Sequence, residues 1–194
     1  MRIGICERAL LAGVCLMASS WTWGQSTEQV PARFDVAVTY NSLLANVTTG
    51  NEFSMEGGSA QVQARLWQRF CAVADVAGFH AGNVNKSGIG LDLITATFGP
   101  RYVWSPSQSR VVFFGQALLG EAHGSNSIFP AATALNSSGN SFALEVGGGI
   151  NYLLTPRFSV RAIDADWLRT QLPNATTNVQ NNLRLGAGIV YRIK

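Results

Sequence analysis

Apolar and polar side chains alternate at the end of the chain, over residues 181–193. The odd positions are apolar or aromatic, namely Leu183, Leu185, Ala187, Ile189, Tyr191 and Ile193. The even positions are Asn182, Arg184, Gly186, Gly188, Val190 and Arg192. A period of two places successive side chains on opposite faces of a β-strand. The pattern therefore predicts a strand with one apolar face, directed either into a soluble core or outward into lipid.

Seven earlier segments show strand patterns of similar length, close to the ~9–11 residues of a tilted transmembrane strand. They are residues 33–40, 59–67, 71–79, 91–104, 110–122, 141–153 and 158–170. Segment 110–122 is apolar on both faces, so its facing stays open. In 158–170 the alternation is inconsistent. A regular strand would place apolar Val160 on the same face as Asp164, and Arg161 on the same face as apolar Ile163. A β-bulge within this segment would resolve the conflict, at a position that the sequence does not fix.

The connections between these segments alternate in length. The long ones are 41–58, 80–90, 123–140 and 171–180, and the short ones are 68–70, 105–109 and 154–157. The long connections are rich in Asn, Ser, Thr and Gly, whereas two of the short ones contain proline, a turn residue. Strict alternation gathers every long loop at one end, as in transmembrane barrels. We therefore predict an all-β fold, an eight-stranded antiparallel up-and-down transmembrane β-barrel.

The first residues have the features of a secretory signal peptide. Arg2 and Arg8 flank a short basic region, the apolar run 9–18 follows, and small residues precede position 25. The run is shorter than the ~20 residues of a spanning helix. We predict a cleaved signal peptide over 1–24, a linker over 25–32 and the barrel over 33–194; an uncleaved anchor helix is the alternative. Cleavage would leave Cys71 as the only cysteine and therefore no intrachain disulfide.

Charge is scarce in this chain. Charged residues make up 13% of it, against ~25% in a typical soluble domain. The net charge of +3 includes no run of lysine or arginine. Such a distribution argues against a nucleic-acid partner.

Three motifs resemble the eight-stranded outer-membrane β-barrel family of the OmpA/OmpX type. They are Thr97-Phe98-Gly99-Pro100-Arg101-Tyr102, the segment 114–120 (Phe-Gly-Gln-Ala-Leu-Leu-Gly), and the alternating terminal strand. The resemblance covers residues 33–193. It implies a Gram-negative outer-membrane location, a lipid bilayer as surroundings and the barrel-assembly machinery as a partner. The family usually ends on an aromatic residue that this machinery reads, whereas the chain ends on Ile193-Lys194.

The polar faces of the strands would fill the interior of such a barrel. An eight-stranded barrel has an interior just wide enough for its own side chains. The predicted interior charges are Arg65, Arg101, Arg184, Arg192, Asp35, Asp75 and Glu145, with Asp164 or Asp166. Their near balance predicts a closed plug of ion pairs. An ion or solute path is the alternative.

One segment could carry catalysis. Glu121, His123 and Ser125 share a face at the mouth of the third long loop, and some outer-membrane barrels act on lipid A with such residue types. An exposed histidine is the simpler interpretation. Gly147-Gly148-Gly149 is followed by a strand rather than a helix, so it predicts close packing under a bulky neighbour instead of a phosphate site. We predict no catalytic, cofactor or metal site and no enzymatic activity.

The sequence thus predicts a non-enzymatic integral outer-membrane protein whose loops serve adhesion, ligand binding or envelope integrity. A lipid-A-modifying barrel enzyme and a soluble lipocalin-like calyx for a small apolar ligand are the alternatives. Aromatic residues near the strand ends favour the membrane, where they form girdles at the interfaces. They are Phe34, Tyr40, Tyr102, Trp104, Tyr152, Trp167 and Tyr191.

Overall fold

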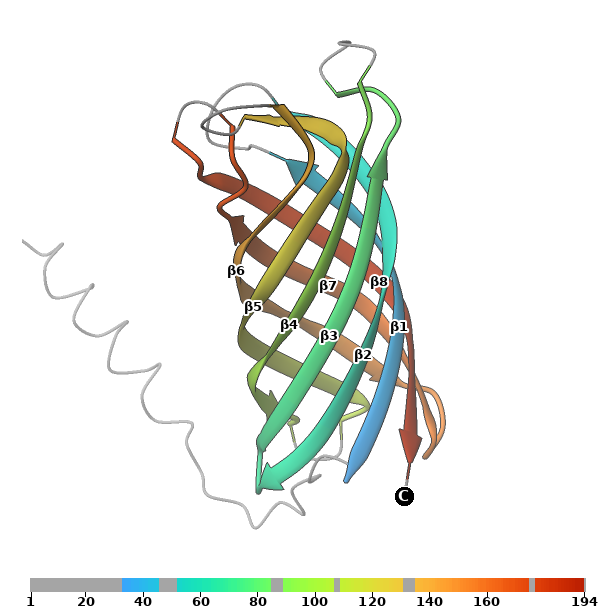
Figure 1. Cartoon of the computed structure of the whole chain (residues 1–194). Helices are drawn as coiled ribbons and strands as arrows, with labels where there is room; N and C mark the ends of the chain where they lie inside the picture. Colours follow the sequence, from blue (N-terminus) through green and yellow to red (C-terminus); the bar gives the residue numbers. More distant parts are fainter. Residues whose placement is uncertain are drawn as a thin grey trace, which may run out of the picture.

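A computed structural model shows a closed barrel of eight strands, each antiparallel to its neighbours in the chain, with β1 paired to β8 (Figure 1). The structure describes residues 33–45, 52–84, 89–106, 109–130, 135–174 and 177–193. The strands are β1 (Phe34–Ala45), β2 (Phe53–Trp67), β3 (Phe70–Ala81), β4 (Leu91–Trp104), β5 (Val111–Pro130), β6 (Leu135–Leu153), β7 (Phe158–Thr170) and β8 (Gln180–Ile193). The predicted fold class is confirmed. The predicted signal peptide and linker lie outside the described residues.

The β1–β2, β3–β4, β5–β6 and β7–β8 connections, predicted as the long loops, lie at one end of the barrel, and the other three connections lie at the opposite end (Figure 1). We call these the loop end and the turn end. In the described residues no helix is both long enough and apolar enough to cross a membrane. The predicted loop 123–140 is nevertheless mostly strand, since β5 runs to Pro130 and β6 starts at Leu135. Its Asn, Ser and Gly residues pair across the two strands, with one register shift between Ser125 and Phe129.

A β-bulge lies in β7, where the parity conflict predicted one. Arg161 pairs with Gly188 and Asp164 with Gly186, so two β7 residues face Ala187 alone. The extra residue moves the alternation by one position. Asp164 and Arg161 consequently both point into the barrel, and Ala162 and Ile163 both point out.

The outward face carries a continuous apolar band. On β4, exposed apolar side chains run from Ile94 to Trp104. Ten residues at ~3.3 Å each span about 33 Å, or about 23 Å of height at a ~45° tilt. The apolar band of transmembrane barrels is ~25 Å tall. The outer face therefore has the height that a bilayer core requires.

Aromatic side chains concentrate at the turn end of this band. All seven aromatics predicted for the girdles face outward, and ring contacts link several neighbours. The contacting pairs are Trp67–Phe70, Phe70–Tyr102, Trp104–Phe113 and Phe158–Tyr191, with ring centroids 5.0 to 6.3 Å apart. The turn end thus carries a near-continuous aromatic rim, which is typical of a membrane interface.

Candidate functional site

The centre of the barrel is a buried polar network around Arg184. Its guanidinium donates to Asp75 Oδ2 at 2.5 Å, Glu145 Oε1 at 3.0 Å, Ser59 Oγ at 2.6 Å and Asn41 Oδ1 at 3.2 Å. Arg184 and both carboxylates are 0–1% exposed. Such charges are tolerated in an interior when they are paired and hydrogen-bonded. Arg184 therefore joins four other strands, β1, β2, β3 and β6, to β8.

Two further arginines lie below this network, toward the turn end. Arg101 donates to Gln61, Gln63 and Gln116, and Arg161 donates to Asn151, Gln61 and Asp164. Both guanidiniums also contact one aromatic ring. The Cζ atoms of Arg101 and Arg161 lie 4.3 and 4.7 Å from the ring centroid of Phe114. Desolvated cation–π contacts of this kind are worth ~2 kcal/mol each.

Gly149, in the triple glycine of β6, makes room for that ring. A Cβ at Gly149 would lie 2.8 Å from Phe114 Cζ, and one at Gly148 would collide with the Phe114 backbone oxygen. Real side chains do not approach so closely, so these positions require glycine. The prediction of close packing under a bulky neighbour is confirmed.

Most predicted interior charges are where the alternation placed them. Buried or half-buried inside the barrel are Arg101, Arg184, Arg192, Asp35, Asp75, Glu145, Asp164 and Asp166. The prediction was wrong for Arg65, which is exposed because β2 reaches its turn there and its pairing register shifts. Arg161 was missed. Because the position of the β7 bulge was not fixed, the sequence did not decide which face carries Arg161. In the structure Arg161 points into the barrel and is 1% exposed.

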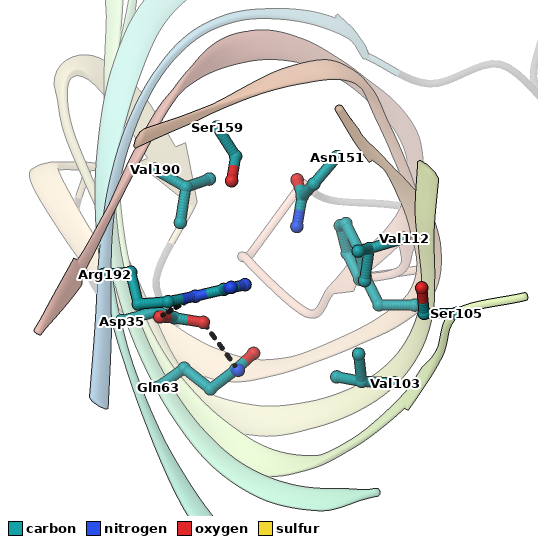
Figure 2. A pocket seen from close by; sticks show the side chains of 10 residues that line it. Asp35, Gln63, Val103, Ser105, Val112, Asn151, Ser159, Val190 and Arg192 are labelled. Carbon is teal, nitrogen blue, oxygen red and sulfur yellow. Dashed lines mark hydrogen bonds and ion pairs between the residues drawn. The ribbon is translucent and has the colours of Figure 1, made fainter. Parts of the chain in front are cut away.

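A small polar cavity lies inside the barrel at the turn end (Figure 2). Gln63 Nε2 donates to Asp35 Oδ2 at 3.2 Å, and Arg192 Nε lies 3.6 Å from Asp35 Oδ1. The cavity measures about 30 Å³, which is room for one or two water molecules. We call this cavity the vestibule; its volume is too small for a solute.

A second, larger interior cavity lies at the loop end. We call it the apolar cup; its volume is about 160 Å³, and its walls include Leu43, Phe53, Met55, Leu93, Phe129 and Leu172. On β8 the order from the loop end is Asn182 in the cup, Arg184 in the central network and Arg192 in the vestibule. No residue lines both cavities. The central network, whose Arg184, Asp75 and Glu145 are 0–1% exposed, lies between the two cavities and fills the centre of the barrel.

The three candidate catalytic residues lie on the outer face of β5. Glu121 and His123 are exposed and Ser125 is half-buried. The Nδ1 atom of His123 contacts Asn140 Oδ1, where a hydrolase would hold a carboxylate to orient and stabilise the ring. The common face is confirmed, but the orienting acid is absent from that position. The described residues also contain no group of three histidine, cysteine or acidic side chains that could hold a metal ion.

The outer face of the barrel carries a belt of polar side chains near the loop end. Glu56 accepts hydrogen bonds from Tyr40 at 2.9 Å, Ser42 at 3.0 Å and Ser54 at 3.1 Å. His80 and Asn126 both contact Asp92. This loop-end belt contrasts with the aromatic rim at the turn end, so the two edges of the apolar band differ in chemistry.

No family model matches the sequence, and no curated protein matches it. Solved structures do match. Neisserial surface protein A is 17% identical, with a TM-score of 0.64 over 84% of this chain and 98% of that one. Ail, the attachment invasion locus protein of Yersinia pestis, is 18% identical, with a TM-score of 0.53 over 82% and 99%.

The outer membrane protein OprG from Pseudomonas aeruginosa is 10% identical, with a TM-score of 0.51 over 84% of this chain and 97% of that one. At these identities the likeness concerns the fold alone. The chain therefore has the fold of bacterial outer-membrane β-barrels.

Proposed function

We propose that this chain is an integral protein of the Gram-negative outer membrane, where its barrel anchors a loop end exposed outside the cell. The observation that carries the proposal is the inverted distribution of side chains. Large apolar groups such as Val38, Phe98 and Ile189 are about 60% exposed on the outer face, while Arg184, Asp75 and Glu145 are buried inside. Lipid is the solvent that suits such an exterior.

This distribution also separates the proposal from a soluble calyx. A contiguous apolar surface on a soluble monomer rarely exceeds a few hundred Å², whereas here the apolar band covers the outward faces of all eight strands. The centre of the barrel is charged rather than apolar. A lipocalin-like calyx would need the opposite arrangement.

The role that we propose is non-enzymatic presentation of the loop end, for adhesion, ligand binding or envelope integrity. The closed interior supports a role at the surface rather than transport. The fold of Ail, whose name refers to attachment and invasion, is consistent with such a surface role. Insertion by the barrel-assembly machinery and cleavage of residues 1–24 belong to the same proposal.

Fractionation and labelling test this topology together. The protein should sediment with outer membranes and resist extraction without detergent. In a Cys71→Ala background, Ser137→Cys in the exposed start of β6 should react with an impermeant thiol reagent on intact cells, and Thr155→Cys in the β6–β7 turn should react only after lysis. A soluble periplasmic protein would refute the membrane assignment, and reversed labelling would refute the orientation.

A separate variant tests the enzymatic alternative. His123→Ala should leave the acylation of lipid A unchanged in cells that produce the protein, because Asn140 rather than a carboxylate contacts the ring. Mass spectrometry of extracted lipid A measures this directly. A change in acyl number that depends on the parent chain and is lost with His123→Ala would establish an active site on the outer face of β5.

A further inference from the structure

The walls of the apolar cup are fixed by contacts of their own. The side-chain amide of Gln180 pairs with the backbone of Leu172, accepting from its N–H at 2.9 Å and donating to its C=O at 2.8 Å. Thr170 Oγ1 also donates to Gln180 Oε1 at 3.1 Å. These bonds hold the segment after β7 against the start of β8, and Leu172 is 6% exposed at the loop end of the barrel.

The part of the wall next to Leu172 is held by close packing against two glycines. A Cβ at Gly124 would lie 2.7 Å from the ring of Phe129 and 3.2 Å from Leu172 Cδ1, and one at Gly139 would lie 3.4 Å from the same ring. Phe129 is therefore seated against bare backbone on β5 and β6. Because these parts of the wall are positioned without an occupant, the cup is a preformed cavity.

The chemistry of the lining selects against ions. No acidic, basic or histidine side chain is among the residues that line the cup. Its polar residues include Ser127 of β5 and, on the adjacent strands β7 and β8, Thr170, Gln180 and Asn182. Water gains little in a cavity of this kind, whereas an apolar molecule replaces missing dispersion contacts.

The volume sets the size of the occupant. A cavity of about 150 Å³ lined by leucine, isoleucine and phenylalanine stays dry and binds benzene, and the apolar cup measures about 160 Å³. We infer that the apolar cup is a binding site for neutral molecules of one aromatic ring that enter from the loop end. The central network forms the floor of the site, so binding involves no passage through the barrel. This inference goes beyond the membrane role and does not depend on it.

Met55 provides a reporter inside the site. It is the one methionine among the described residues, lines the cup and is 1% exposed. The full chain, labelled with ¹³C at methionine methyl groups and reconstituted in phospholipid nanodiscs, should show a saturable shift of the Met55 signal on titration with benzene. Loss of the signal in Met55→Leu assigns it. Benzoate, which carries a charge, should cause no such shift.

A second methionine serves as the control for benzene that simply dissolves in the bilayer. Ala60 is exposed on the outer face of β2, so Ala60→Met places a methyl group in lipid. Its signal should change linearly with benzene, without saturation. Saturation at Met55 together with linearity at position 60 separates binding in the cup from partition.

Two variants that fill the cup complete the test. Ala45→Leu and Ser127→Leu enlarge lining side chains from opposite sides, and each should abolish the saturable shift, while Ala60→Leu on the outer face should keep it. Circular dichroism confirms that each variant folds. The inference is overturned if benzene leaves Met55 unchanged, or if the shift survives in the folded filling variants. Cross-relaxation between Met55 and lipid acyl protons before titration would also overturn it, because a bilayer lipid would then be the occupant.

Discussion

Replacing Arg184 by methionine should lower the free energy of unfolding by about 3–5 kcal/mol. The variant would leave Asp75 and Glu145, both buried, without the cation that now lies 2.5 and 3.0 Å from their oxygens. Removing one partner of a buried ion pair is costly because the remaining charge stays desolvated. Reversible unfolding in lipid vesicles measures the effect.

Two further variants test whether the loss of stability comes from the central network. Arg110→Met removes an exposed arginine at the turn end and should change stability by less than about 0.5 kcal/mol. Adding Asp75→Asn and Glu145→Gln to Arg184→Met should recover part of the loss, because neutral amides are cheaper to bury than carboxylates. Equal stability of the Arg184 and Arg110 variants would show that the network does not support the fold.

Placing arginine at position 187 should destabilise the barrel by about 2–4 kcal/mol in a bilayer. Ala187 is exposed on β8, midway between Leu183 and Tyr191 on the apolar face, where a charge would lose its hydration. Unfolding in vesicles of matched thickness gives the value.

The control for this variant lies outside the apolar band. Ser137→Arg introduces the same charge at an exposed position near the tip of β6, and it should cost less than about 0.5 kcal/mol. If both variants unfold like the parent, residue 187 does not face lipid. The facing of β8 and the membrane assignment would then both fail.

Alternation alone was sufficient to predict the strands and most of the interior, because each barrel residue has only two directions to point. It failed where the ladder is irregular. The β7 bulge depends on pairing with β8, so the sequence showed a conflict near Arg161 without its position. Arg65 continues the alternation of the inward residues Gln61 and Gln63, but it lies near the end of β2, where the pairing shifts. The local composition of the sequence does not show where this strand ends.

The loop end was harder to predict for a related reason. Residues 123–130 and 135–140 have the composition of a loop, yet they extend β5 and β6 because each strand satisfies the backbone groups of the other. Asn126 adopts a φ of 54° at the register shift, a conformation that asparagine tolerates well. The apolar cup had no sequence signature, since its lining comes from β1, β2, β4, β5, β7, β8 and the segments that follow β3 and β7.

The seam between β1 and β8 sets the order in which the barrel can be completed. Phe34 pairs with Ile193 and Leu44 with Leu183, so residues at the two ends of the described chain meet, whereas every other strand pairs with a neighbour in sequence. Hairpins from β1 to β7 can form early and locally, but closure must wait until β8 reaches β1. Until then β1 and β7 each present an unpaired edge that hydrocarbon cannot satisfy. In the proposed membrane location an unclosed barrel therefore has no stable resting state, and insertion and closure must proceed together.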